Sequence, residues 1–138
     1  LGLRVEACID DDDEAAFAVM RKRVASRVLS QYPHWEYLEA IGIKLPDAFV
    51  EIAKRPNAGK AVGEASPYMP REVVESMVLA GNAGRCAAQL AAGLSSRVTH
   101  LTMRPHATAG HDVADVIRAF IEKVVPRALQ LREKTKTS

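Results

Sequence analysis

The sequence is poor in cysteine and aromatic residues and has no long apolar run. Its two cysteines, Cys8 and Cys86, form neither a CxxC pair nor the dense framework of a disulfide scaffold. Aromatic residues make up only 5% of the chain, which favours helices over an all-β fold. Every apolar run is broken well before the roughly 20 residues that a membrane span requires. The composition therefore argues against a disulfide scaffold, an all-β protein and a membrane-spanning protein.

Neither sign of charge dominates the sequence. Nineteen basic residues oppose 17 acidic ones, and the two kinds are interleaved along the chain. Binding of nucleic acid needs a concentrated basic patch, so we expect no nucleic acid partner. The 138 residues, 48% of them hydrophobic, fit one globular domain. The start of the chain lacks the pattern of a secretory signal, so we expect a cytoplasmic protein with two buried thiols; a disulfide between them stays open.

The first part of the chain predicts a strand followed by a long helix. Residues 3–9 alternate between apolar and polar side chains, which is the pattern of a strand. Residues 10–14 (DDDDE) lack the alternating spacing and the glycine of a calcium loop. We interpret them as the cap and acidic first turn of a helix. Apolar residues at helical spacing continue this helix to about Gln31.

The rest of the chain predicts more helices and one more strand. Apolar spacing indicates helices before that strand at about residues 36–41, 46–52, 70–79 and 83–94, the last capped by Asn82. Residues 98–103 are rich in β-formers and predict the second strand, and Asp112 caps a final helix. Residues 55–67 predict a flexible loop, and residues 131–138 a solvated tail. This order defines a helix-rich α/β fold with about two parallel strands.

Three polar residues lie at or beyond the ends of the two predicted strands. Asp10 follows the first strand, and Arg104 and His106 end the second. Parallel α/β proteins bind ligands at the carboxyl ends of their strands, so these three are candidate cofactor- or substrate-binding residues. Arg104 can hold a phosphate or carboxylate, and His106 can donate a hydrogen bond. A local ion pair for Arg104, an exposed His106 and a helix cap for Asp10 stay open as alternatives.

The pattern assigns no residue a catalytic role. His100, His106 and His111 fall within twelve residues, but their spacing matches neither a helical zinc pair nor a zinc finger. We therefore expect no bound metal and keep a metal-dependent hydrolase only as a minor alternative. Cys86 falls on the apolar stripe of a predicted helix, which is typical of a core thiol.

Several segments resemble the C-terminal end of the luciferase-like oxidoreductases, which use a flavin or a deazaflavin. Residues 78–94 (VLAGNAGRCAAQLAAGL) lead into residues 98–105 (VTHLTMRP), much as a helix start leads into a closing barrel strand in that family. Residues 120–129 (FIEKVVPRAL) are similar to the family's final helix, which carries a proline near its end. The opening strand and acidic turn also resemble a late barrel strand.

The resemblance implies the C-terminal part of a (β/α)8 TIM barrel. It further implies a parent oxidoreductase, such as a monooxygenase, that acts on a small molecule with FMN or coenzyme F420. Most cofactor-contacting strands of such a barrel would be missing, so we expect the chain alone to be inactive. The opening at Leu1, directly before a strand, suggests a cut edge. We expect the partner to be the N-terminal barrel portion or, in a homo-oligomer, a second copy. A non-catalytic, self-associating helical module is the alternative.

Overall fold

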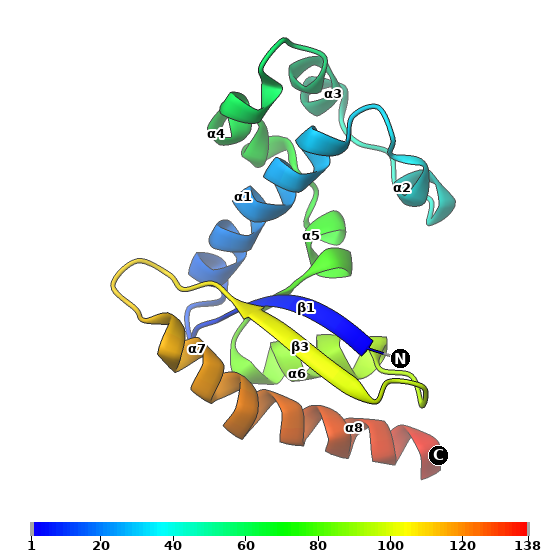
Figure 1. Cartoon of the computed structure of the whole chain (residues 1–138), viewed down its shortest axis with the longest axis vertical. Helices are drawn as coiled ribbons and strands as arrows, with labels where there is room; N and C mark the ends of the chain where they lie inside the picture. Colours follow the sequence, from blue (N-terminus) through cyan, green and yellow to red (C-terminus); the bar gives the residue numbers. More distant parts are fainter. Residues whose placement is uncertain (1, 138) are drawn as a thin grey trace. The chain divides into compact units, whose positions relative to one another are not determined.

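The computed structural model describes residues 2–137 and the side chains of residues 2–134. The chain forms two compact units, one of Leu1–Met20 with Val78–Ser138 and the other of Arg21–Met77. The first unit holds the strands and the C-terminal helices, and the second is built of helices (Figure 1). The expected helix-rich α/β class is confirmed. No helix in the described part of the chain combines the length and the apolar character needed to cross a bilayer.

A parallel sheet of three strands organises the first unit, in the order β2-β1-β3. The central strand is β1 (Gly2–Ile9). On one side β3 (His100–Pro105) pairs with β1 along its whole length. On the other side β2 (Leu79–Gly81) pairs only with the last three residues of β1. All three strands therefore present their carboxyl ends at one edge of the sheet.

The sequence predicts about two strands and misses β2, because the predicted helix runs on to residue 79. In the structure, α5 (Arg71–Met77) ends two residues earlier and the chain passes almost directly into β2. The three residues of β2 are all buried and too few to show a period of two. Their sequence cannot be distinguished from the end of an apolar helix face.

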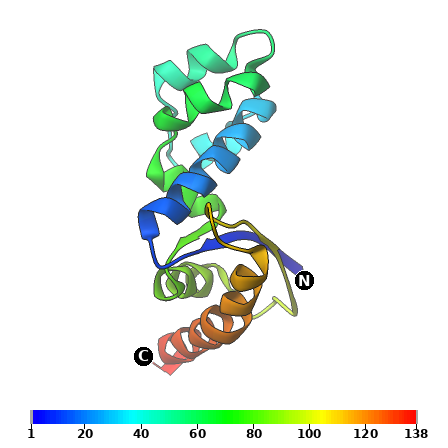
Figure 2. The same ribbon diagram turned by 90° about the vertical axis from the view of Figure 1, so that its left-hand side faces the viewer.

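Helices cover one face of the sheet. They are α6 (Ala83–Gly93), α7 (Val113–Ala119), the π-helical turn η3 (Phe120–Val124) and α8 (Val125–Thr137), and Figure 2 shows α6 and the C-terminal helices on the same side of β1. The core between these helices and the sheet is apolar. Its buried members are Ala7, Ile9, Leu79, Cys86, Ala87, Leu90, Val116, Phe120, Val124 and Ala128.

The opposite face of the sheet carries polar side chains over much of its length, whereas Cys8 and its neighbour Ala80, near the carboxyl ends of β1 and β2, are buried on it. Arg4, Thr102 and Arg104 are exposed, and the strand register sets Arg4 beside Thr102 and Glu6 beside Arg104. Successive side chains of a strand alternate between faces, so these residues point to the face opposite to that of their apolar neighbours. We call this set, together with His106, the polar sheet face.

Three helix starts are capped as the sequence predicts. The side chains of Asp12, Asn82 and Asp112 accept hydrogen bonds from backbone N–H groups of the first turn, at 3.1, 2.9 and 3.0 Å. The interpretation of the acidic run as a helix start is confirmed, with Asp12 as the cap. The helix that it opens, α1 (Asp13–Gln31), ends where the apolar pattern ends.

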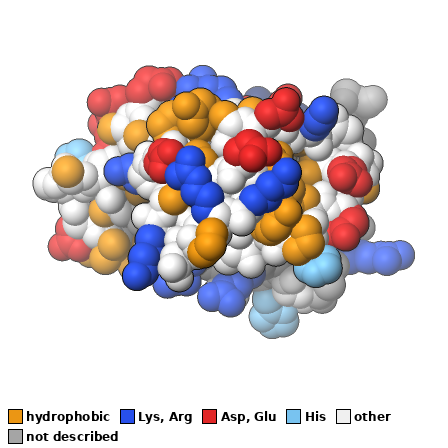
Figure 3. All heavy atoms as spheres, turned by 90° about the horizontal axis from the view of Figure 1, so that it is seen from above, with side chains coloured by type: hydrophobic (Ala, Val, Ile, Leu, Met, Phe, Trp, Pro, Cys, Tyr) orange, Lys and Arg blue, Asp and Glu red, His pale blue; other side chains and the backbone are white. Residues whose placement is uncertain are grey.

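The second unit packs short helices around its own apolar core, which includes Leu38, Phe49 and Met69. It contains the later part of α1 and the whole of α5. Between them lie α2 (Glu36–Ala40), α3 (Asp47–Ala53), η1 (Ala58–Ala61), α4 (Val62–Ala65) and η2 (Ser66–Tyr68). The prediction of a flexible loop at residues 55–67 is thus wrong in its local structure. Proline and glycine break this segment into single turns rather than preventing helix. Figure 3 shows basic and acidic side chains interspersed on one face of the molecule.

The C-terminal helix differs from its prediction at its end. Pro126 has no N–H to donate, and the π-turn η3 lies just before it. Beyond this proline, α8 continues to Thr137. The predicted tail at residues 131–138 is therefore helical as far as the structure describes it, and Ser138 lies outside the described residues.

The turn from β2 into α6 requires glycine. Gly81 has a φ of +128°, and a Cβ there would lie 2.8 Å from Arg85 Cδ and 2.9 Å from Asp13 Oδ1. We expect Gly81→Ala to lower the free energy of unfolding by about 1–3 kcal/mol in urea denaturation, because strain and crowding add. The control is Gly93→Ala in α6, where a Cβ meets no atom within 4 Å. Equal losses in the two variants would contradict the prediction.

Candidate functional site

The carboxyl edge of the sheet gathers polar segments from distant parts of the sequence. Residues 10–12 follow β1, Asn82 follows β2, and residues 106–111 follow β3. Because the three strands are parallel, these segments meet at one edge. This edge is where parallel α/β proteins place their ligands.

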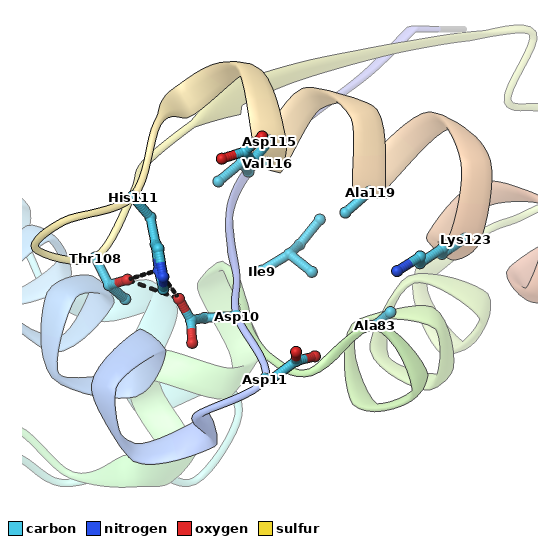
Figure 4. Close-up of a pocket in the computed structure, with 10 residues that line it drawn as sticks. All are labelled: Ile9, Asp10, Asp11, Ala83, Thr108, His111, Asp115, Val116, Ala119 and Lys123. Carbon is cyan, nitrogen blue, oxygen red and sulfur yellow. Dashed lines mark hydrogen bonds and ion pairs between the residues drawn. The ribbon is translucent and has the colours of Figure 1, made fainter.

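A pocket of about 270 Å³ lies at this edge, and we call it the edge pocket. Its lining combines apolar and charged side chains: Ile9, Asp10, Asp11, Ala83, Thr108, His111, Asp115, Val116, Ala119 and Lys123. Figure 4 shows Asp10, Thr108 and His111 together on one side of Ile9 and Lys123 on the other. The lining carries three aspartates and one lysine, so it disfavours anionic ligands.

Asp10 is held by three hydrogen-bond donors. Its Oδ2 lies 2.6 Å from Thr108 Oγ1 and 2.6 Å from His111 Nδ1, and its Oδ1 accepts from the Asp12 backbone N–H at 2.9 Å. The side chain is only 9% exposed. The Thr108 hydroxyl, followed by the Asp12 N–H and the His111 ring, lowers the pKa of Asp10 below its usual value. Asp10 is therefore a fixed carboxylate, and the cap of α1 is its neighbour Asp12.

A second aspartate of the same run joins β1 to the start of α6. Asp13 Oδ1 accepts from the Asn82 backbone N–H at 2.6 Å, and its Oδ2 accepts from Asn82 Nδ2 at 3.3 Å. The Asn82 side chain in turn caps α6. This network uses the N–H groups of Asn82 and Arg85, two of those at the α6 start that could otherwise bind an anion.

Arg104 and His106 lie away from this pocket. His106 Nε2 is 3.0 Å from Glu6 Oε1, and the His106 backbone N–H donates to the Ala7 carbonyl at 2.9 Å. Arg104 is exposed on the polar sheet face, beside Glu6 in the register. Of the three predicted site residues, the structure thus brings Arg104 and His106 together, whereas Asp10 belongs to the edge pocket.

The sequence prediction missed Thr108 and Lys123 and considered His111 only as a zinc ligand. Thr108 and His111 lie in the turn between β3 and the cap of α7. The polar character of this turn could have identified them. The turn follows a strand and precedes a helix, and the segment around Asp10 does the same. Lys123 lies in η3, and the sequence around it carries no such signal.

The three clustered histidines have separate partners. His100 Nδ1 is 2.9 Å from Thr99 Oγ1, His106 contacts Glu6, and His111 contacts Asp10. In the described part of the chain, no group of three or more His, Cys, Asp or Glu side chains could hold a metal ion.

Both cysteines are buried and free, as expected for core thiols. Burial, with a smaller contribution from Asp10, raises the pKa of Cys8 to about 11. Burial also raises the pKa of Cys86 to about 12. Each thiol is therefore protonated near neutral pH and is a poor nucleophile.

Comparisons with protein-family models, with curated proteins and with solved structures find no match to this chain. The resemblance to luciferase-like oxidoreductases therefore stays a prediction. The contacts and charges of the two polar regions carry the interpretation of function.

Asp10→Asn tests the energetic role of the Asp10 carboxylate. The pKa of Asp10 is lowered in the folded chain, so its carboxylate stabilises the fold above the usual carboxyl pKa. That stabilisation is lost as the pH falls through the usual value toward the lowered one. We expect the variant to lose about 1–3 kcal/mol of unfolding free energy near neutral pH and less in acid, measured by urea denaturation. Asp11→Asn, at the exposed neighbour, should change stability little at either pH.

The buried thiols should resist modification. We expect Ellman's reagent at about pH 8 to leave both cysteines of the folded chain unreacted, because the thiolate is the reactive form. Both should react once urea unfolds the chain. Ser95→Cys adds an exposed thiol as a control and should react at once in the folded protein. Fast reaction of Cys8 or Cys86 under native conditions would contradict the burial described above.

Proposed function

We propose that this chain is the C-terminal part of a luciferase-like oxidoreductase that uses FMN or coenzyme F420. In this proposal the chain is cytoplasmic, is completed by an N-terminal barrel portion and is inactive without it. The observation that carries the proposal is the contrast between the two faces of the sheet. Helices and an apolar core cover one face, whereas the other face exposes Arg4, Thr102 and Arg104 and is buried only toward its carboxyl end, at Glu6, Cys8 and Ala80.

This contrast favours a barrel wall over an open doubly wound sheet. Helices cover both faces of a doubly wound sheet, so both of its faces are apolar. In a (β/α)8 barrel the helices cover the outer face only, and the carboxyl ends of the strands carry the functional side chains. The part of the second face that stays exposed, at Arg4, Thr102 and Arg104, agrees with a wall that the remaining strands of a barrel would close, because a barrel interior is packed with side chains.

The strand order sets a condition on the proposal. Consecutive strands of a closed (β/α)8 barrel are neighbours, so β2 would lie between β1 and β3. In this chain β1 is central. The proposal therefore requires that β3 occupies the side of β1 that an upstream strand takes in the complete barrel. Completion of the barrel would move β3 to the outer edge of β2.

The residues fit an anionic cofactor at one of the two polar regions. FMN and coenzyme F420 both carry phosphate, and the three aspartates of the edge pocket would repel it. Arg4 and Arg104 on the polar sheet face can attract such a group. In the proposal Arg104 holds an anionic group of cofactor or substrate, and His106, fixed by Glu6, supplies a hydrogen bond. When bound, the cofactor supplies the hydride chemistry.

A titration of cofactor fluorescence tests this function. We expect FMN and coenzyme F420 to be unaffected by the 138-residue chain alone and quenched by the longer protein of the full reading frame. In that longer protein, Arg104→Gln should weaken binding by about tenfold or more, because a charge-assisted contact is lost. Arg97→Gln, at an exposed arginine of the turn before β3, is the control. Tight binding by the short chain, or none by the long one, would contradict the proposal.

A self-associating, non-catalytic module is the second candidate, because the sheet has open edges. β2 and β3 each have one side without a strand partner in the described chain, and such edges pair readily with another chain. Light scattering after size exclusion distinguishes the two. A stable oligomer of the short chain, together with no cofactor binding by the long chain, favours the module.

A further inference from the structure

Three side chains of the edge pocket form a closed triangle of polar atoms. Asp10 Oδ2 lies 2.6 Å from Thr108 Oγ1 and 2.6 Å from His111 Nδ1, and the last two atoms are 2.7 Å apart. The Thr108 hydroxyl has one hydrogen, and each ring nitrogen has at most one. The carboxylate oxygen can accept from both neighbours at once.

This arrangement selects one form of the neutral His111 ring. With a hydrogen on Nδ1, the ring donates to Asp10, and the hydroxyl does the same. Without it, lone pairs of Nδ1 and Oδ2 would face each other at 2.6 Å. The network therefore assigns the proton of the neutral ring to Nδ1 and leaves Nε2 with a free lone pair.

Backbone contacts and burial fix the positions of the three side chains of this triangle. Asp10 comes directly after the central strand, and Asp12 N–H fixes its other oxygen. Thr108 is only 8% exposed. The His111 backbone N–H donates to the Thr108 carbonyl at 3.1 Å, which closes a turn that contains Gly110 at a φ of +81°. His111 itself is 58% exposed in its side chain and lines the pocket, so a small molecule can reach it.

The pocket indicates which molecules can approach the ring. Ile9, Ala83, Val116 and Ala119 supply apolar surface. The other charged groups in its lining are Asp11, Asp115 and Lys123. Together with Asp10, the carboxylates outnumber the lysine, which disfavours an anion. A small uncharged organic molecule suits this lining best.

We propose that His111 is an acid–base residue of the edge pocket, with Asp10 and Thr108 as positioning residues. Nε2 takes an acidic proton from an uncharged organic molecule bound in the pocket, and the imidazolium later returns a proton to the product or to water. Asp10 orients the ring and stabilises the imidazolium, as the carboxylate of an Asp–His pair does. This function uses no cofactor and lies apart from the polar sheet face, so it stands independently of the oxidoreductase proposal.

Elimination of 5-nitrobenzisoxazole by the 138-residue chain tests the base directly. Nε2 would take the ring C–H proton while the N–O bond breaks, and the cyanophenolate product is coloured. We expect the chain to exceed an equal concentration of free imidazole by about tenfold or more. His111→Gln should abolish that excess, and His34→Gln, at the exposed histidine of the second unit, should leave it unchanged. A rate no higher than that of imidazole, or one unaffected by His111→Gln, would overturn the proposal.

Nitrogen-15 NMR of the histidine rings tests the positioning roles. We expect the neutral His111 ring of the unmodified chain to carry its hydrogen on Nδ1. Asp10→Asn should shift the hydrogen toward Nε2 and lower the elimination rate by about fivefold or more. Thr108→Val, which keeps the carboxylate, should have a smaller effect on both. A hydrogen mainly on Nε2 in the unmodified chain would overturn the assignment, even if Asp10→Asn fails to fold.

Discussion

The parallel pairing of β1 with strands on both of its sides is the constraint on which the first unit depends. Alternation along β1 sends Ala7 and Ile9 into the core and Glu6 to the other face. Its last residue leads into Asp10, and the ends of β2 and β3 meet there. A register shift of one residue would move every side chain of β1 to the other face of the sheet. The core, the polar sheet face and the edge pocket would then lose the residues that now form them.

The two polar regions that this pairing creates differ in charge. The polar sheet face carries Arg4 and Arg104, whereas the edge pocket is lined by Asp10, Asp11 and Asp115. One region suits an anion, and the other suits an uncharged molecule near a base.

Local signals predicted much of this architecture, and non-local contacts explain the rest. The caps at Asn82 and Asp112 are readable because each side chain bonds its own first turn. Asp10 and Arg104 could be chosen as candidates in the same way, because the end of a strand is recognised from the local sequence pattern. The partners of Asp10 could not be found in this way, because Thr108 and His111 lie 98 and 101 residues further along the chain. β2 was missed because three residues hold too little pattern, although its pairing with β1 defines the sheet.

The Glu6–His106 contact depends on the strand order. Glu6 is only 6% exposed, and a carboxylate at such a depth is costly unless a partner compensates it. His106 reaches Glu6 because β3 lies directly beside β1, and this contact would break if β3 moved beyond β2. A barrel that places β2 between them must therefore offset the loss of this contact. The order β2-β1-β3 is thus the arrangement that keeps His106 beside Glu6.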